Sequence, residues 1–194
     1  MVVVEGGPTH AKACVALAES VAYRDGCDPS QGFLVGPLTP ERFAYYLRHG
    51  VVRIARDGAG VVGFLIAYKS GSEPFAELSG YNDLTEWAGW HPNLSPDLLY
   101  IHQTAVARHA RCRGVARTLY SALRTEFPGH DLYAATAEKP VRNEASLAMR
   151  ARLGFVRVGT FRAAEAYGFK DFESGIYLLR ATPDPGTTPA GYPA

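Results

Sequence analysis

The stretch that decides the fold is LLYIHQTAVARHARCRGVARTLYSALR, residues 98–124. It opens with a mostly apolar run, 98–107, that predicts a buried strand. A short basic loop, 108–113, follows, and small residues then lead into a helix that we expect to end near Arg124. A strand that passes directly into a helix leaves the first N–H groups of that helix free, and these groups attract anions.

The loop and helix are rich in arginine, and no acidic residue occurs between Asp97 and Glu126. Guanidinium groups carry permanent charge and forked donors that suit phosphate oxygens. The pattern Arg111-x-x-Gly114-x-Ala116 lacks the Lys-Ser/Thr of a P-loop and does not match G-x-G-x-x-G. Taken alone, the hexapeptide also fits an ordinary strand–turn–helix with a solvated basic edge. The rest of the sequence has to distinguish this interpretation from an anion-binding loop.

Length and composition indicate one globular domain. The chain has 194 residues, which is close to the size of one domain and enough to bury a full core. It is 47% hydrophobic and 20% charged, as is typical of globular rather than disordered proteins. Because the formal net charge is only +1, a general nucleic-acid binder is not expected, and the arginines are a local feature.

Cysteine usage and the N-terminal sequence favour a cytoplasmic protein. Cys14, Cys27 and Cys112 are an odd, widely spaced set without C-x-x-C, which fits a reducing compartment and neither a disulfide framework nor a zinc site. The N-terminal MVVVEGGPTH shows no secretory signal. No apolar stretch of about 18 residues occurs, so we expect no membrane span. The cysteine spacing likewise gives no reason to expect a bound metal.

The remaining chain predicts alternating strands and helices. We expect strands at residues 2–4, 51–56, 61–68, 98–107, 131–137, 156–161 and 175–179, and helices at 10–24, 39–48, 114–124 and 143–153. Residues 57–60 (Asp-Gly-Ala-Gly) predict a hairpin turn.

The long segment 69–97 has little periodic pattern, and we expect a short helix near 82–90. It carries Tyr81, Trp87 and Trp90, which either wall a substrate pocket or pack beneath a surface flap.

Two further motifs accompany the arginine loop. Asn143-Glu-Ala-Ser146 through Leu153-Gly154-Phe155 resembles the N-x-x-A/S…L-G-F helix of the GNAT superfamily of N-acyltransferases, and residues 111–116 resemble the acyl-CoA pyrophosphate loop of that family. Thr104-Ala105-Val106 resembles the x-A-V segment just before that loop. The three motifs are correctly separated, and the order of elements also agrees, so the resemblance covers about residues 2–181.

The resemblance implies the α/β (α+β) GNAT fold. This fold has a central, mixed, mostly antiparallel sheet of six to seven strands, flanked by about four helices. We therefore expect a single domain over residues 1–181, followed by a Pro/Gly-rich C-terminal tail at 182–194.

The resemblance also implies that acetyl-CoA is the co-substrate. In the family, two central strands splay apart, and the pantetheine arm pairs with exposed backbone of the kind found at any unpaired strand edge. The residues implied to bind it are Thr104, Ala105 and Val106 along the strand, Arg111, Cys112, Arg113, Gly114, Val115 and Ala116 in the loop, and Asn143 and Ser146 on the last helix.

Acetyl transfer to an amine needs a group that accepts a proton, because a lysine-like amine has a pKa of about 10.4. The family often places this base on the central strand shortly before x-A-V. Tyr100 and His102 share a face there, and His102 is the better base by its ordinary pKa. Glu138, at the end of the next strand, is a second candidate. The alternatives are a structural histidine hydrogen-bonded between strand and helix, and an ordinary surface acid.

One position departs from the family pattern. Many members have a tyrosine four residues before the Gly-Phe pair, where it protonates the departing thiolate. This chain has Arg150 there, and arginine is a poor proton donor because it stays charged. Three alternatives stay open: water, stabilisation of the thiolate by Arg150, or another tyrosine among Tyr100, Tyr133, Tyr167 and Tyr177.

By resemblance, the chain is an N-acetyltransferase that moves an acetyl group from acetyl-CoA to a primary amine of a small molecule, amino acid or peptide by direct attack. The alternative is a catalytically weak GNAT-fold module that binds acyl-CoA, which the missing tyrosine favours. The sequence names neither the acceptor nor the preferred acyl chain, and it leaves a homodimer open.

Overall fold

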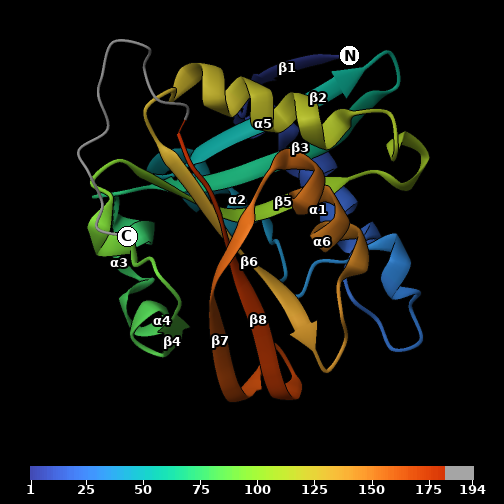
Figure 1. The fold of residues 1–194 in the computed structure, drawn as a ribbon. Helices are drawn as coiled ribbons and strands as arrows, with labels where there is room; N and C mark the ends of the chain where they lie inside the picture. The colour runs from blue at the N-terminus through green and yellow to red at the C-terminus, as the bar shows by residue number, and fades with distance from the viewer. Residues whose placement is uncertain (182–194) are drawn as a thin grey trace.

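The strands form one eight-stranded sheet in the order β1-β2-β3-β5-β6-β8-β7-β4 (Figure 1). The computed structural model describes residues 1–181, so the predicted C-terminal tail, 182–194, lies outside the described residues. The strands are β1 (Val2–Glu5), β2 (Val51–Asp57), β3 (Gly60–Lys69), β4 (Thr85–Trp87), β5 (Leu98–Val106), β6 (Asp131–Lys139), β7 (Val156–Ala166) and β8 (Phe169–Leu179). Every neighbouring pair is antiparallel except β5 and β6. The mixed, mostly antiparallel sheet is confirmed, with one strand more than the six to seven predicted.

Six α-helices occur within residues 1–181, where about four were expected. They are α1 (Ala11–Ser20), α2 (Pro40–His49), α3 (Glu73–Ala76), α4 (Ser79–Asp83), α5 (Val115–Glu126) and α6 (Glu144–Leu153). The two extra helices, α3 and α4, are short and lie in the segment that the sequence left almost without pattern.

The prediction of a helix near residues 82–90 was wrong. α4 ends at Asp83, and β4 then adds an edge strand to β7. The partner of Trp87 in this pairing is Gly159, where a Cβ would lie only 3.0 Å from the carbonyl oxygen of Glu86. Because Gly159 has no side chain, β7 can pair with β4, and the local sequence of β4 does not predict this pairing.

The last two strands are longer than the sequence predicted, and they form a hairpin. The connecting residues Tyr167 and Gly168 have φ values of 54° and 81°. Two successive residues with positive φ are what a type I′ hairpin turn requires, and its twist matches that of the flanking strands. The predicted breaks at Phe161 and Gly175 therefore lie inside continuous strands.

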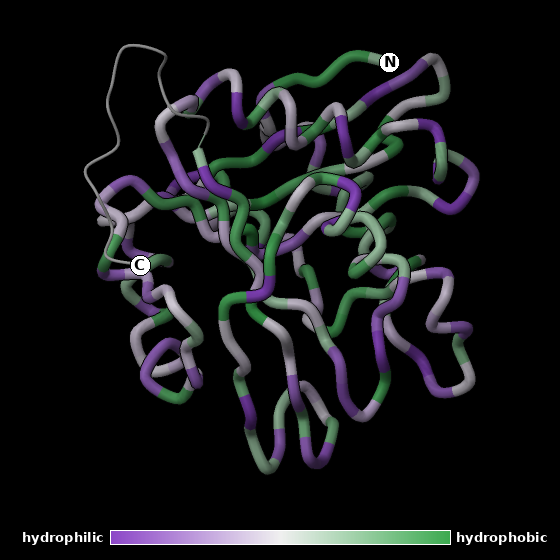
Figure 2. Tube along the Cα trace, in the orientation of Figure 1, coloured by the Kyte–Doolittle hydropathy of each residue, from purple (hydrophilic) through white to green (hydrophobic). Residues whose placement is uncertain are grey.

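Helices cover both faces of the sheet. α1 and α2 pack on one face, and α5 packs on the other, against β1, β2 and β3 (Figure 1). Figure 2 shows hydrophobic residues running along the central strands and hydrophilic residues gathered in loops and hairpin ends. Among the described residues, none of the helices combines the length and the apolar character that crossing a bilayer requires.

Gly63 of β3 allows α5 to approach the sheet closely. A Cβ at this position would lie 2.8 Å from Cγ1 of Val115 and 3.0 Å from the carbonyl oxygen of Ala105. Val115 is the first residue of α5. The absence of a side chain on Gly63 therefore brings the start of α5 against the end of β5.

We predict that Gly63→Ala lowers the free energy of unfolding by about 1–3 kcal/mol, because the added methyl group overpacks this contact. Urea denaturation measures the effect. Gly58→Ala is the matched control, since a Cβ there meets nothing within 4 Å, and it should change stability by less than about 0.5 kcal/mol. Equal effects of the two substitutions would contradict the close approach.

Candidate active site

β5 and β6 pair only over their first residues. The parallel ladder joins Leu98–Tyr100 to Asp131–Tyr133, and no ladder joins the two strands beyond that point within the described residues. On its other edge β5 stays paired with β3 as far as Val106. Backbone groups of residues 101–106 that point towards β6 therefore have no strand partner. We call this opening between β5 and β6 the strand notch (Figure 1).

A β-bulge in β5 lies beside the strand notch. While β3 advances one residue from Ile66 to Ala67, the paired residue of β5 changes from Gln103 to Ile101. His102 is therefore the extra residue of the bulge. Bulges redirect side chains and are common next to active sites.

After the bulge, consecutive side chains of β5 point to opposite faces of the sheet, as in any strand. Nε2 of Gln103 donates a hydrogen bond of 3.2 Å to the carbonyl oxygen of Gly36, in the connection between α1 and α2. The hydroxyl of Thr104 lies 3.3 Å from that of Tyr120 on α5. The α1–α2 side and the α5 side of the strand notch are thus lined by different residues of the same strand.

His102 sits among aromatic rings on the α1–α2 side. Its Nε2 lies 3.0 Å from the hydroxyl of Tyr46 on α2, and its ring stacks on Tyr68 with centroids 4.8 Å apart. Burial, and after it the charge of Arg42, lower the pKa of His102 to about 4. His102 is therefore neutral at physiological pH. The sequence predicted an ordinary pKa for His102, and this prediction is corrected. The rings that bury the imidazole come from segments far away in the sequence, so the sequence around His102 could not indicate them.

Arg150 of α6 reaches the strand notch from the opposite side. Its Nε donates to Oγ1 of Thr136 at 2.5 Å, and its Nη2 donates to the carbonyl oxygen of Ala135 at 3.2 Å. Its Nη1 donates to the hydroxyl of Tyr120 at 3.4 Å. The side chain is only 5% exposed. Arg150 thus joins α6, α5 and β6 beneath the opening.

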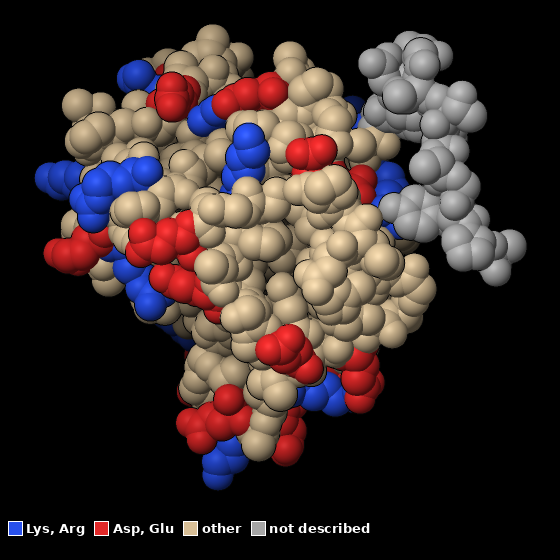
Figure 3. Space-filling model, turned by 90° about the vertical axis from the view of Figure 1, so that its left-hand side faces the viewer, with Lys and Arg blue, Asp and Glu red and all other residues tan. Residues whose placement is uncertain are grey.

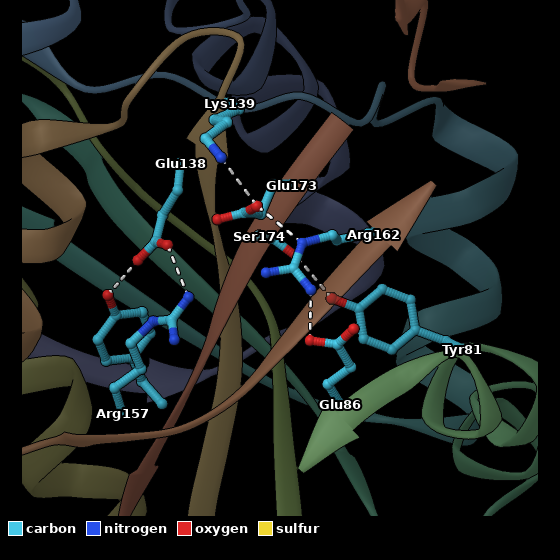
Figure 4. Close-up of polar contacts among 9 residues, drawn as sticks. Tyr81, Glu86, Glu138, Lys139, Arg157, Arg162, Glu173 and Ser174 are labelled. Carbon is cyan, nitrogen blue, oxygen red and sulfur yellow. Dashed lines mark hydrogen bonds and ion pairs between the residues drawn. The ribbon is translucent and has the colours of Figure 1, made fainter. Parts of the chain in front are cut away.

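Glu138 lies on the same side of the sheet as α6. It extends over Gly175, the ladder partner of Thr136. Its carboxylate accepts hydrogen bonds from the hydroxyl of Tyr177 at 2.5 Å and from Nη2 of Arg157 at 3.0 Å (Figure 4). Burial acts to raise the pKa of this carboxyl, but the two hydrogen bonds outweigh it and leave the pKa below the usual value. The structure therefore does not bring the two candidate bases together.

A second group of charged side chains ties the edge of the sheet together (Figure 4). Glu173 of β8 accepts from Nζ of Lys139 at 3.1 Å and from Nε of Arg162 at 3.0 Å. Arg162 also pairs with Glu86 of β4. These contacts hold the segment of α3, α4 and β4 to the β7–β8 hairpin.

The aromatic residues of this segment pack inward. Tyr81 stacks on Phe161 with centroids 4.0 Å apart, and the ring of Trp90 lies 5.4 Å from that of Tyr133. Trp90 is 3% exposed. Figure 3, which faces this side of the molecule, shows a largely uncharged surface with a central hollow and charged groups near its margins. Packed aromatics beneath a surface flap therefore describe the segment better than an open aromatic wall.

The loop after β5 presents backbone donors to open space. Cys112 and Gly114 both have positive φ, 59° and 81°. Gly114 is the N-cap of α5, and no side chain caps the helix there. A Cβ on Gly114 would meet nothing within 4 Å. The first N–H groups of a twelve-residue helix, with their partial positive charge, thus have no side-chain cap and begin next to open space at Gly114.

The basic side chains of the loop have no acidic partner. Within residues 1–181 no carboxylate forms an ion pair with Arg111 or Arg113. Nη1 of Arg111 lies 3.4 Å from Oε1 of Gln31. Burial, and after it the nearby charge of Arg108, lower the pKa of Arg111 from its usual value. An anion with several oxygen acceptors would satisfy both this charge and the helix N–H groups.

Asn143 has a structural role at the start of α6. Its Oδ1 accepts from the backbone N–H of Ser146 at 3.2 Å, as an N-cap does. Its Nδ2 donates to the carbonyl oxygen of Phe33 at 2.7 Å, which ties the α1–α2 connection to α6. The side chain of Asn143 is therefore engaged within the protein.

Tyr120 is a site residue that the sequence reasoning missed. Its hydroxyl contacts Thr104 and Arg150, and its ring is 1% exposed. The available signal was its place beside Leu119 and Leu123 on the buried face of α5, because a buried tyrosine hydroxyl usually finds a hydrogen-bond partner. Tyr46 carried no comparable signal, since its partner His102 is 56 residues away.

Comparison with known proteins agrees with this geometry. Residues 25–155 match the family described as Acetyltransferase (GNAT) family. No curated protein sequence matches the chain.

Solved structures share the fold at low sequence identity. NAA60 from Arabidopsis thaliana, in complex with a bisubstrate analogue, is 16% identical, with 92% of this chain and 98% of that chain covered and a TM-score of 0.64. The structure of smu.2055 from Streptococcus mutans UA159 is 13% identical, with 94% of this chain and 100% of that chain covered and a TM-score of 0.67. The ribosomal-protein-S18-alanine N-acetyltransferase from Escherichia coli is 14% identical, with 96% of this chain and 97% of that chain covered and a TM-score of 0.64. At these identities the likeness establishes the fold.

We predict that Gly114→Glu abolishes binding of CoA while the protein still folds, because the new carboxylate occupies the open space and repels phosphate. Isothermal titration calorimetry measures the affinity, and circular dichroism checks the fold. Gly114→Ala is the control for the left-handed backbone, which costs a non-glycine residue about 1–2 kcal/mol, and it should still bind. Unchanged CoA affinity in a folded Gly114→Glu protein would place the phosphate site elsewhere.

We predict that His102 makes the fold less stable in acid. Its pKa is about 4 in the folded protein against an ordinary value of 6.5, so between these two pH values the unfolded chain binds the extra proton. The free energy of unfolding should therefore fall as the pH decreases from 6.5 to about 4. Urea titrations at several pH values measure this slope.

His102→Gln should flatten the slope, because glutamine can still bond to Tyr46 but does not titrate. His109→Gln, at an exposed position, is the matched control and should keep it. The same slope in wild type and His102→Gln would show that other groups cause the acid sensitivity.

Proposed function

Because the chain belongs to the Acetyltransferase (GNAT) family, we propose that it transfers an acetyl group from acetyl-CoA to a primary amine. The acceptor is a small molecule, an amino acid or a peptide, and its nitrogen attacks directly. The observation that carries the proposal is the strand notch, whose unpaired β5 edge leads straight to the uncapped start of α5.

The residues around the strand notch fit acetyl-CoA, which supplies an acyl group activated as a thioester. The backbone of Thr104, Ala105 and Val106 offers hydrogen-bonding groups without a strand partner towards β6. Beyond them, the open space outside Gly114 and the arginines without acidic partners suit a pyrophosphate. The solved complex of Arabidopsis thaliana NAA60 with acetyl-CoA supports the same donor.

The acceptor amine approaches from the α1–α2 side in this proposal. His102 is the better placed of the two candidate bases there, because Glu138 is already bound by Arg157 and Tyr177 on the other side. With a pKa of about 4, His102 cannot store a proton at neutral pH. It therefore passes the proton on through the hydroxyl of Tyr46, 3.0 Å away. A rate limb at pH 6–7, expected from an ordinary histidine, does not belong to this site.

Backbone donors complete the chemistry. An unpaired N–H of β5 beside the acyl group can stabilise negative charge on the carbonyl oxygen during attack. Because the amine must first lose a proton, the rate should rise with pH as the acceptor, rather than His102, becomes deprotonated.

We predict that acetyl-CoA stabilises the protein and that at least one amine in a broad panel is acetylated. A ligand that binds only the folded state adds about 2.7 kcal/mol at one hundred times its Kd, so the melting temperature should rise. Release of free thiol and mass spectrometry of the amines measure turnover. The panel should contain small amines, amino acids and peptides, including peptides with N-terminal alanine.

The outcomes separate the two candidate functions. Stabilisation without turnover of any amine would favour the catalytically weak acyl-CoA-binding module, which the replacement of the family tyrosine by Arg150 supports. No thermal shift at a large excess of CoA or acetyl-CoA, in a protein that is otherwise folded, would overturn the cofactor assignment itself. Gly114→Glu serves as the matched negative control in both assays.

A further inference from the structure

Arg150 is a buried cation whose partners are all neutral. Its three hydrogen bonds go to the hydroxyls of Thr136 and Tyr120 and to the carbonyl oxygen of Ala135. No carboxylate forms an ion pair with it within residues 1–181. A guanidinium has five N–H donors, so part of its donor capacity remains unused. The adjacent ring of Phe155, 5.5 Å away, adds only a weak attraction.

Such an arrangement is costly in the unliganded protein. A charge taken out of water needs an opposite charge to recover its lost hydration, and neutral hydrogen bonds recover only part of it. Arg152, on the same helix, shows the ordinary alternative, since its side chain is exposed to solvent. The position of Arg150 therefore indicates that an anion is present there at some stage of function.

The surroundings of Arg150 place that anion at the strand notch. Thr136 belongs to β6, and Tyr120 continues the contact to Thr104 of β5. A polar chain of Thr104, Tyr120, Arg150 and Thr136 thus connects the two strands where they have parted. It lies between the closed end at Tyr100 and the open end at the loop of Gly114.

We propose that the guanidinium of Arg150 binds the sulfur of CoA as a thiolate when the acetyl group leaves. The inference rests on the proposed function, which lays the pantetheine arm along β5 with its phosphates at Gly114 and its sulfur deeper in the strand notch. Arg150 then acts as a catalytic residue by electrostatic stabilisation of the leaving group.

The step is balanced without a proton donor. The amine nitrogen forms a bond to the carbonyl carbon, the C–S bond breaks, and its electron pair leaves on sulfur. The proton of the amine passes to His102 and then to solvent. The sulfur departs as an anion held by the cation, and it takes a proton from water only after release. A tyrosine is therefore not required at the position of Arg150.

The test measures the ionisation of the thiol in bound CoA, so it needs no acceptor amine. Thiolates absorb ultraviolet light more strongly than thiols. The absorbance of the CoA complex is followed against pH, with the complex of desulfo-CoA subtracted to remove the signal of protein tyrosines. An opposite charge within contact distance lowers a pKa by about 1–3 units. The bound thiol should therefore ionise about one to three pH units below free CoA.

Three variants test whether Arg150 causes the lowered pKa of the bound thiol. Arg150→Met, which keeps the length of the side chain without its charge, should abolish the shift. Arg150→Lys keeps the charge and should retain part of it. Arg152→Met is the matched control on the same helix and should leave the shift unchanged. Calorimetry with desulfo-CoA should give nearly equal affinities for all folded proteins, because only the sulfur contact is removed.

The possible failures are distinguishable. An unshifted thiol in wild-type protein that binds CoA would overturn the inference and leave the proposed function standing, as would a full shift in Arg150→Met. Absence of CoA binding would overturn both. If Arg150→Met fails to fold, the pKa of the bound thiol in wild type and in Arg150→Lys still tests the inference. An arginine with only a structural role would not lower the pKa of the thiol in either protein.

Discussion

The early end of the parallel pairing between β5 and β6 is the constraint on which the rest of the structure depends. Three residues of each strand are joined, and beyond Tyr100 and Tyr133 each strand keeps only its other neighbour. Backbone groups left without partners inside a protein are costly. The chain can carry them because the unfilled edge opens toward the loop at Gly114, where a ligand can supply hydrogen bonds and negative charge together.

The two sides of the strand notch differ in the groups that line them. On the α1–α2 side the strand presents a neutral histidine among tyrosine rings. On the side of α5 and α6 it faces the hydroxyl of Tyr120 and the guanidinium of Arg150. In the proposed function, these two environments suit an anionic acetyl donor and an amine acceptor on opposite sides of one sheet.

Sequence patterns predicted those parts of the site that depend on neighbouring residues. The strand, basic loop and helix of residues 98–124 were identifiable because their signals lie within one stretch. The helix expected over residues 143–153 is likewise present as α6, with Asn143 as its N-cap. The bulge at His102, the low pKa of its ring and the edge strand β4 could not be predicted. Each arises from a segment far away in sequence: β3, the rings of α2 and β3, and Gly159 of β7.

The replacement of a motif tyrosine by arginine shows why burial has to accompany sequence comparison. Judged by residue type alone, Arg150 removes a proton donor and suggests a weakened enzyme. Its burial changes the argument, because an arginine that had merely lost a function could turn to solvent, as Arg152 does two residues later on α6. Arg150 instead stays among the hydroxyls of Thr136 and Tyr120, at the place where the two strands part. A fixed positive charge there lowers the energy of an anionic leaving group directly, so the substitution changes the means of stabilisation without removing it.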